Sequence, residues 1–220
     1  MSIIESGWLK ILNNSGSGNA NIGVQTKELN KGRNSRAKGI TVTTSKGTTK
    51  DATITQSGNP AYIDIAYTVK NMGASDTSVI IEGKTNVASL NFALSNNDAG
   101  LSLPQNIAIN RSGTSSFEPS SDNVESRAIS NGIATPQSDY GREGEMAFRI
   151  VLQGSANGTV NSRSSVLTIS GNGVTVVVTI IQAAGTSVVD VNDITLERTS
   201  GATGTLVITS NDSWTITIDD

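Results

Sequence analysis

Apolar and polar residues alternate in short runs along most of this chain. Near the C-terminus the alternation places Leu206 and Ile208 on one face and Val207 on the other, and Trp214, Ile216 and Ile218 follow in the same period. A period of two is typical of a half-buried β-strand. Val, Ile and Thr dominate these runs and Gly, Ser and Asn separate them, as in short strands joined by tight turns. The pattern predicts an all-β protein.

Helical periodicity is weak throughout the chain. The segment Ser121–Asn131 is the one place where we expect one or two helical turns, because Ser121 or Asp122 could cap them.

Two stretches match each other as strand, turn, strand. Residues 36–58 and 163–185 each begin with the arginine of an Asn-Ser-Arg triplet. Both end with a Gln that is followed, after one or two residues, by a Gly. An asparagine, Asn30 or Asn157, precedes each triplet by four residues. The segments before these asparagines, 22–26 and 148–153, are also candidate strands. The turns contain residues suited to hairpins, Ser45-Lys46-Gly47 and Gly171-Asn172-Gly173.

A second and weaker match links the middle of the chain to its C-terminus. Three segments of the middle, 63–67, 77–81 and 84–90, compare in order with 193–196, 205–208 and 210–214. The middle region therefore carries both halves of a repeat in order. The N-terminal region carries the later half, and the C-terminal region carries the earlier half.

These residues resemble the BACON domain, a small immunoglobulin-like β-sandwich. The elements that carry the resemblance are Ser210-Asn211-Asp212-Ser213-Trp214, Trp8-Leu9, Gly16-Ser17-Gly18-Asn19, Asn30, Arg36 and Gln56-Ser57-Gly58. Read from 186 to 220 and then from 1 to 58, they follow the order of one complete domain. The middle copy departs from the pattern. It has no tryptophan, its end Gln182-Ala183-Ala184-Gly185 is one residue longer, and residues 95–145 stand where a short turn belongs.

The resemblance implies immunoglobulin-like β-sandwiches, with one complete copy and one split between the chain ends. We expect residues 1–58 to be a C-terminal half, 59–185 a complete copy with an insertion at 95–145, and 186–220 an N-terminal half. The halves would join in cis, as a permuted domain, or in trans between copies. The simpler alternative is that the ends are boundaries of an unusual sandwich. The expected core of the split domain is Trp8, Trp214, Leu206, Ile208 and Ile216; a sugar-stacking role is the alternative for the tryptophans.

The insertion is too long for a plain turn, and long loops are usually functional or disordered. Leu101-Ser102-Leu103 and Ile107-Ala108-Ile109 alternate and could form two extra strands or an edge hairpin. We expect a docking arm that lies on a partner, with candidate contacts Phe117, Tyr140, Arg111 and Arg127. The alternative is a solvated excursion that caps the sandwich.

Composition narrows the chemistry. The chain has no cysteine and no histidine, which removes disulfides, thiolate nucleophiles, the usual zinc ligand sets and Ser-His-Asp triads. The formal net charge of -3 and the lack of polybasic runs give no indication of nucleic acid or anionic membrane partners. We expect no enzymatic activity, metal or cofactor. Asp190, Asp193, Asp219 and Asp220 are interpreted as solvated turn carboxylates rather than a cation site.

Two further expectations concern the cell. Glu5 and Lys10 interrupt the N-terminal apolar residues, so no signal peptide is predicted. The longest apolar stretch, 174–181, is too short for a membrane span.

The chain is similar to small structural proteins of crAss-like phages. That resemblance implies a non-enzymatic virion protein, an auxiliary capsid (decoration) or head-fibre component, made in the host cytoplasm and located on the capsid surface. Its expected partners are other capsid or fibre proteins and further copies of itself, as a homo-oligomer. The alternative is a carbohydrate-binding or mucin-adhesion module, with Tyr62, Tyr67 or Tyr140 contacting a glycan.

Overall fold

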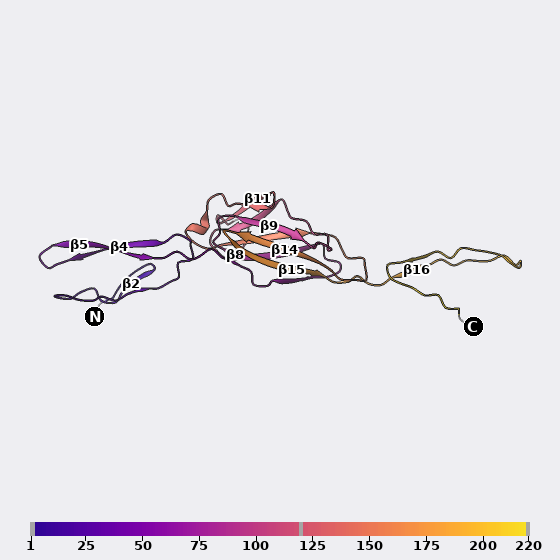
Figure 1. The fold of residues 1–220 in the computed structure, drawn as a ribbon, viewed down its shortest axis with the longest axis horizontal. Helices are drawn as coiled ribbons and strands as arrows, with labels where there is room; N and C mark the ends of the chain where they lie inside the picture. The colour runs from indigo at the N-terminus through magenta and orange to yellow at the C-terminus, as the bar shows by residue number, and fades with distance from the viewer. Residues whose placement is uncertain (1–2, 119–120, 219–220) are drawn as a thin grey trace.

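The computed structural model describes residues 3–118 and 121–218 of the chain. These residues form an elongated molecule with three parts in line: an N-terminal unit, a central sandwich and a C-terminal unit (Figure 1). We use these names for residues 3–58, 59–185 and 186–218. The regular structure is β-strand apart from one 3-10 turn, η1 (Tyr140–Arg142), so the predicted all-β class is confirmed within the described residues.

The central sandwich consists of two immunoglobulin-like sheets that share one strand. The first sheet runs in the order β6 (Ile63–Asp64), β8 (Ser78–Thr85), β13 (Met146–Gln153), β10 (Asn106–Asn110) and β11 (Val124–Ser130). The second runs from the end of β11 through β12 (Ile133–Ala134), β9 (Leu90–Ser95), β14 (Arg163–Gly171) and β15 (Val174–Gln182) to β7 (Val69–Met72). Neighbouring strands are antiparallel except β7, which lies parallel to β15.

The core lies between these sheets and follows the alternation along each strand. In β8 and β14, the inward residues Ile81, Leu167 and Ile169 have no exposed surface. Phe92 and Phe148, from opposite sheets, meet edge to face with ring centroids 6.3 Å apart, a favoured arrangement for aromatic pairs. Alternate residues of the central strands, such as β8 and β14, therefore stabilise the sandwich through burial.

The insertion at 95–145 is built into both sheets. Ile107–Ile109 lie in β10, which pairs with β13 and β11, so this predicted strand is confirmed. Leu101–Leu103 form only an isolated bridge, between Ser102 and Gln153. The predicted helical turns at Ser121–Asn131 are wrong, because Val124–Ser130 form β11 and pair with β10 and β12. Pairing with neighbours that are distant in sequence outweighed the local capping signal.

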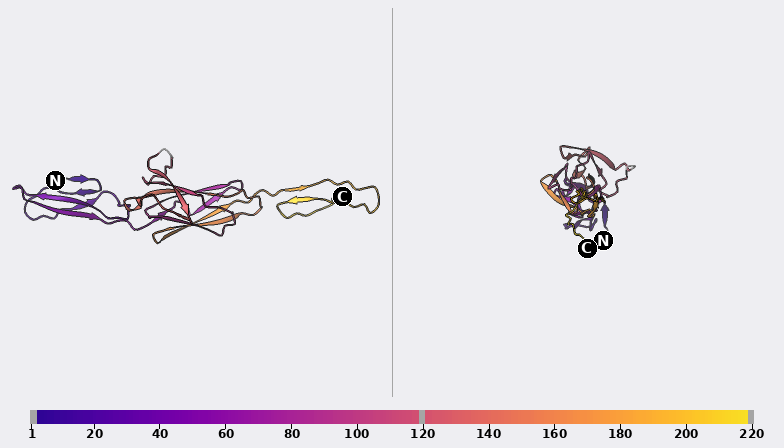
Figure 2. Two further views of the ribbon diagram at one scale, coloured as in Figure 1. Left: turned by 90° about the horizontal axis from the view of Figure 1, so that it is seen from above. Right: turned by 90° about the vertical axis from the view of Figure 1, so that its right-hand side faces the viewer.

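The two outer units are smaller. The N-terminal unit has a three-stranded sheet of β1 (Ile4–Ser6), β2 (Leu9–Ile11) and β3 (Val24–Thr26), and a hairpin of β4 (Arg36–Thr43) and β5 (Thr49–Gln56). The C-terminal unit has one antiparallel pair, β16 (Val189–Val191) and β17 (Ile208–Ser210). The left view of Figure 2 places these units at opposite ends of the central sandwich. None of the described residues forms a helix that could cross a membrane.

Candidate assembly interface

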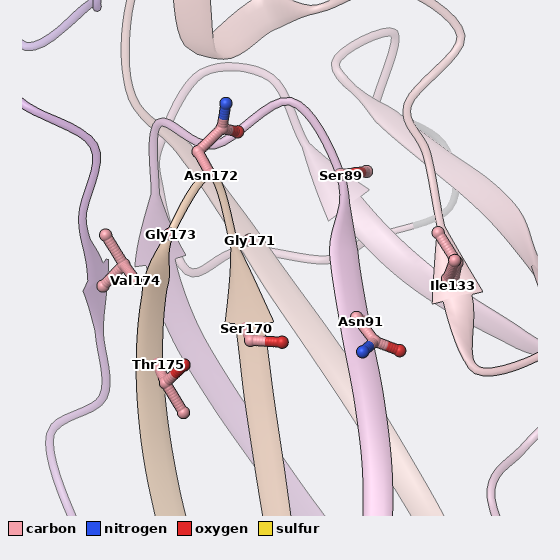
Figure 3. A pocket seen from close by; sticks show the side chains of 9 residues that line it. All are labelled: Ser89, Asn91, Ile133, Ser170, Gly171, Asn172, Gly173, Val174 and Thr175. Atoms are coloured by element: carbon pink, nitrogen blue, oxygen red, sulfur yellow. The ribbon is translucent and has the colours of Figure 1, made fainter.

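The central sandwich has an open hollow of about 400 Å³ beside the turn between β14 and β15 (Figure 3). Asn172 and Gly173 form this turn with positive φ angles of 48° and 81°, as the predicted hairpin chemistry requires. The Asn172 side chain accepts a hydrogen bond from the Ala88 N–H at 2.7 Å. The hollow is lined by Ser89, Asn91, Ile133, Ser170, Gly171, Asn172, Gly173, Val174 and Thr175. No ionisable side chain lies among them, so the hollow offers no acid–base chemistry.

Acidic residues also form no metal site in the described part of the chain. No group of three or more His, Cys, Asp or Glu side chains there could hold an ion. Asp219 and Asp220, which belonged to the weighed cation site, lie outside the described residues.

The N-terminal unit repeats the polar framework of the later half of the central sandwich. Asn30 Nδ2 donates to the backbone carbonyls four and 27 residues further on, at 2.8 and 3.1 Å. Asn157 Nδ2 donates to the carbonyls four and 26 residues further on, at 2.8 and 2.9 Å. Both asparagines are buried. The two asparagines therefore make matching hydrogen bonds at the positions that the sequence comparison paired.

An arginine–glutamine pair completes this framework in each copy. Arg36 donates to Gln56 Oε1 and Arg163 donates to Gln182 Oε1, both at 2.7 Å. The partners face each other across paired strands in both copies. In each pair, Arg and Gln also donate to one shared carbonyl, eight residues before the arginine. The hairpin β4–β5 thus corresponds to β14–β15.

The C-terminal unit shares a hydrogen-bond pattern and a strand register with the first half of the central sandwich. Asn86 accepts a hydrogen bond from the Tyr62 N–H at 3.0 Å, and Asn211 accepts one from the Val188 N–H at 2.9 Å. Each asparagine also donates to a carbonyl two residues earlier than that N–H, at 3.1 and 2.9 Å. The strand registers agree: Ile63 lies opposite Thr85, as Val189 lies opposite Ser210. β16 and β17 therefore correspond to β6 and β8.

This register corrects one alignment made from the sequence. Residues 193–196 were matched with 63–67, but the counterpart of Ile63 is Val189. Residues 193–196 form no strand in this structure. Short apolar runs of similar residues can be aligned in several ways, and the backbone pairing decides among them.

The same asparagines join each unit to the one before it. Asn86 Nδ2 donates to the Lys31 carbonyl at 3.1 Å, and Asn211 Nδ2 donates to the Gly158 carbonyl at 2.7 Å. Lys31 and Gly158 each directly follow the framework asparagine of their unit. The junction between the N-terminal unit and the central sandwich is therefore repeated between the central sandwich and the C-terminal unit.

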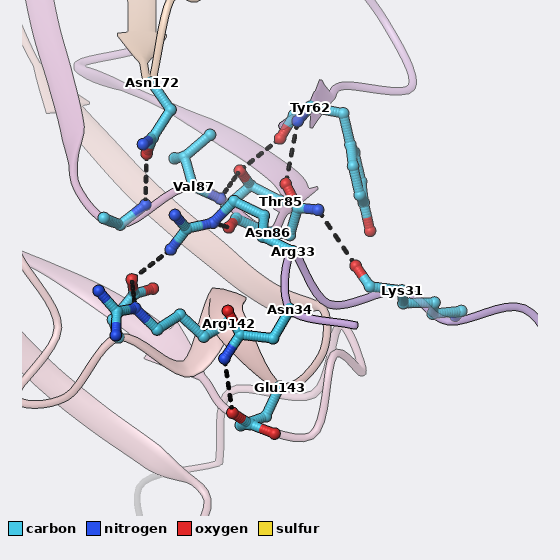
Figure 4. Close-up of polar contacts among 12 residues, drawn as sticks. Lys31, Arg33, Asn34, Tyr62, Thr85, Asn86, Val87, Arg142, Glu143 and Asn172 are labelled. Carbon is cyan, nitrogen blue, oxygen red and sulfur yellow. Dashed lines mark hydrogen bonds and ion pairs between the residues drawn. The ribbon is translucent and has the colours of Figure 1, made fainter. Parts of the chain in front are cut away.

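The first junction has an additional brace, formed by residues 139–145 of the insertion (Figure 4). Arg33 donates to the Asn86 carbonyl at 2.5 Å and forms an ion pair with Asp139. Asn34 donates to Glu143 at 3.1 Å. The brace holds the N-terminal unit against the central sandwich through contacts between segments more than one hundred residues apart.

Glu145 contributes the charged end of this brace. Its carboxylate accepts from Lys31 at 2.9 Å and from the Tyr62 hydroxyl at 2.7 Å, and Lys84 Nζ lies 3.6 Å away. Partial burial opposes ionisation, but the hydrogen bonds from Lys31 and Tyr62 and the charges of both lysines outweigh it and lower the pKa of Glu145. Burial and the bond to Glu145 raise the pKa of Tyr62, so the phenol stays a donor.

The C-terminal unit leaves an apolar face open. Trp214 is 52% exposed and Ile216 is 60% exposed, whereas their counterparts Leu90 and Phe92 are 1% and 2% exposed. These counterparts follow from the alternation, with one residue fewer after Asn211 than after Asn86. The face forms an open groove of about 300 Å³, lined by Val189, Val191, Leu206, Ile208, Trp214, Thr215, Ile216 and Thr217. It includes all the predicted core residues of this half.

The N-terminal unit has the complementary open face. Val42 is 62% exposed, although its counterpart Ile169 is fully buried. Ile40 and Ile54 are half-buried, and their counterparts Leu167 and Ile180 are fully buried.

Trp8 lies apart from its expected neighbour Trp214. It is already buried in the N-terminal unit, where the Arg36 guanidinium lies 5.1 Å from its ring centroid. The two tryptophans belong to units at opposite ends of the molecule.

The residues predicted for a docking arm are used inside the chain. Phe117 is buried under the Arg149 guanidinium, 4.5 Å from the ring centroid. Tyr140 packs against the core with Arg111 over its ring at 5.4 Å, and Arg127 donates to the Thr135 carbonyl at 2.7 Å. The expectation of a free arm at these four positions is corrected, because the insertion joins the sheets and buries its rings. The part of the insertion that does contact another unit is the brace, residues 139–145, and the sequence analysis did not predict it.

Comparisons with known proteins add a limited fold likeness. No family model matches the chain, and no curated protein matches it. Similar solved structures include the periplasmic chaperone SfaE, with 8% identity and a TM-score of 0.33 over 56% of this chain and 58% of that chain.

Two other similar structures belong to bacterial surface proteins. The C-terminal domain of the Streptococcus agalactiae AgI/II polypeptide BspA has 9% identity and a TM-score of 0.32, over 74% of this chain and 62% of that chain. The collagen-binding domain of the Erysipelothrix rhusiopathiae surface protein RspB has 8% identity and a TM-score of 0.24, over 80% and 65%. The chain spans less than two thirds of all three structures. Scores this low support no argument about function.

Proposed function

We propose that the chain is a non-enzymatic structural protein that assembles head to tail. In this proposal the C-terminal unit of one copy completes the N-terminal unit of the next, forming a composite sandwich. The observation that carries the proposal is the match between the two open faces and the two packed halves of the central sandwich. Exposed apolar side chains on both faces have buried counterparts there, as Trp214 has in Leu90 and Val42 has in Ile169.

Completion between copies is favoured over completion within one chain. The two units leave the central sandwich at opposite ends. The asparagine junctions at Asn86 and Asn211 hold each unit in line with the sandwich. Closure within one chain would require both junctions to open and one unit to travel the length of the sandwich. Closure between copies preserves both junctions.

Such a contact is heterologous, since two different surfaces of the chain meet. Heterologous contacts produce a ring when the rotation closes and an open filament when it does not. Each contact adds strands to open sheet edges, where main-chain hydrogen bonds supply affinity and alternate side chains supply register. The three units of one copy lie nearly in line, which supports an open filament.

We further propose that the protein is a component of a phage virion. It is supported by the resemblance of residues 6–58 and 148–220 to BACON domains, and by the similarity of the chain as a whole to small structural proteins of crAss-like phages. In that setting the protein would decorate the capsid or form a head fibre, with capsid or fibre subunits as partners.

Light scattering and electron microscopy of the purified full chain test assembly. We expect filaments or multimers whose mass rises with concentration, and a loss of assembly when residues 187–220 are deleted. A deletion variant with unchanged mass and an equally well-folded N-terminal unit would overturn the proposal. Immunogold labelling of purified virions tests the location: labelled heads support it, and particles without the protein contradict it.

A further inference from the structure

The register of the composite sandwich can be derived from the central sandwich. We infer that residues 195–198 and 214–218 of a second copy pair with β5 and β4, respectively, with Thr217 opposite Thr41. This inference rests on the proposed head-to-tail assembly and specifies its partner surface strand by strand.

The pairing beside β4 follows from β9 and β14. In the central sandwich Ala93 lies opposite Thr168, and Phe92 lies opposite Ile169. Thr41 corresponds to Thr168, because each lies five residues after its framework arginine. Thr217 corresponds to Ala93, because Trp214 takes the position of Leu90.

The same correspondence places apolar side chains together. Ile216 takes the position of Phe92 and meets Val42, the counterpart of Ile169. These side chains are 60% and 62% exposed in the single copy. Joining in this register therefore covers exposed apolar side chains of both faces at once.

Gln56 is placed to donate hydrogen bonds to the C-terminal unit of the second copy, as its counterpart Gln182 shows. Gln182 Nε2 donates to the carbonyls of Asp76 and Ala74, at 3.0 and 3.4 Å, in the turn that precedes β8. Gln56 has the corresponding partners, Arg36 and the Glu28 carbonyl, but within the described residues it has no counterpart of these two contacts.

The counterpart turn is in the C-terminal unit. The Asp76 N–H donates to the Gly73 carbonyl at 3.2 Å, and the Ala202 N–H donates to the Thr199 carbonyl at 3.2 Å. Ser200 and Ala202 then correspond to Ala74 and Asp76. In a second copy their carbonyls would accept from Gln56, which makes Gln56 a specificity-determining residue for assembly.

Parallel pairing beside β5 completes the joint. In the central sandwich, Thr179–Gln182 of β15 pair with Val69–Met72 of β7. Residues 53–56 of β5 correspond to Thr179–Gln182, because Gln56 corresponds to Gln182. Residues 195–198 of the C-terminal unit correspond to Val69–Met72, because both segments directly precede the matching turns. Residues 195–198 form no strand in the single copy, and pairing with β5 would order them.

Engineered cross-links test this register directly, because the chain has no cysteine. The single variants Thr41→Cys and Thr217→Cys are mixed, oxidised and separated on a non-reducing gel, and peptide mapping identifies the linked residues. Directly opposite residues have Cα atoms about 4.5–5.5 Å apart, within the range of a disulfide. We expect a two-chain product joining positions 41 and 217. Both threonines are exposed, so the variants should keep the wild-type melting of the central sandwich.

The matched control is Thr43→Cys mixed with Thr217→Cys. Position 43 lies on the same face as position 41, two residues away. In the inferred register it would be roughly 7–8 Å from position 217, which is beyond disulfide range.

A second test uses Gln56→Leu. This variant should raise the concentration needed for assembly roughly tenfold, through loss of two hydrogen bonds.

The outcomes separate this inference from the proposed function. Cross-linking at 41–217 and not at 43–217 supports the register. Chains that assemble in light scattering but cross-link at 43–217, or at neither pair, overturn the register and leave the assembly role standing. Chains that stay monomeric overturn both. A monomeric, internally linked product from the double variant Thr41→Cys with Thr217→Cys would show the same register closed within one chain, and would overturn both the head-to-tail assembly and the second copy as the partner.

Discussion

Substituting Trp214 by alanine should weaken assembly without destabilising the central sandwich. Trp214 is 52% exposed in the single copy, and its counterpart Leu90 is 1% exposed. Joining therefore covers about half of a tryptophan, or about 75–125 Å² of the roughly 150–250 Å² that this side chain buries in a core. At about 25 cal/mol per Å² the loss is about 2–3 kcal/mol, which corresponds to a roughly 25–150-fold higher dissociation constant.

Sedimentation velocity over a concentration series measures this effect. The midpoint of the transition from single copies to multimers should move to higher concentration by that factor. Tyr67→Ala is the matched control, since it removes an aromatic ring that is also exposed but lies on the central sandwich. The control should assemble like the wild type, and both variants should keep the wild-type melting temperature of the central sandwich.

Two results would refute this reasoning. If Trp214→Ala assembles at the wild-type concentration, the tryptophan lies outside the contact between copies and the correspondence with Leu90 is wrong. If the variant instead lowers the melting temperature of the central sandwich, Trp214 acts on folding rather than on joining.

Three further predictions concern single side chains. Gln182→Leu should lower the free energy of unfolding of the central sandwich by about 1–3 kcal/mol in urea titrations, because the fully buried Gln182 side chain loses its hydrogen bonds to the Asp76 and Ser155 carbonyls; Gln56→Leu should leave that transition unchanged. Asn86→Ala should speed proteolytic cleavage between the N-terminal unit and the central sandwich, because the bond to the Lys31 carbonyl is lost. The lowered pKa of Glu145 means that its stabilising contribution is complete above its ordinary value of 4.5 and is lost as pH falls through the lowered pKa; melting curves should show this loss, and Glu145→Gln should flatten it.

The repeat could be recognised from the sequence because its polar framework uses fixed spacings. Asn30 and Asn157 each reach a carbonyl four residues ahead, and the Arg–Gln pairs close hairpins. Buried polar side chains need partners, so these positions keep the same residue types in both copies. Alternation likewise identified the open face that includes Trp214 and Ile216.

Other features depend on contacts that no local pattern contains. Arg33 and Asp139 are 106 positions apart, and Tyr62 and Glu145 are 83 apart. The role of the insertion was misjudged for the same reason. Its strands are ordered by β13 and β9, and its rings pack against cations such as Arg149. The sequence does contain the two junction asparagines, Asn86 and Asn211, in matching segments. It does not show that they bind the Lys31 and Gly158 carbonyls of the preceding unit.

The unequal junctions have a mechanical consequence. Residues 139–145 reinforce only the link between the N-terminal unit and the central sandwich, and the C-terminal unit has no corresponding segment among the residues that the structure describes. In a fibre built from such copies, stiff and compliant hinges would alternate along the axis. Bending would then concentrate at every second hinge, so the fibre could follow a curved surface without straining its sandwiches.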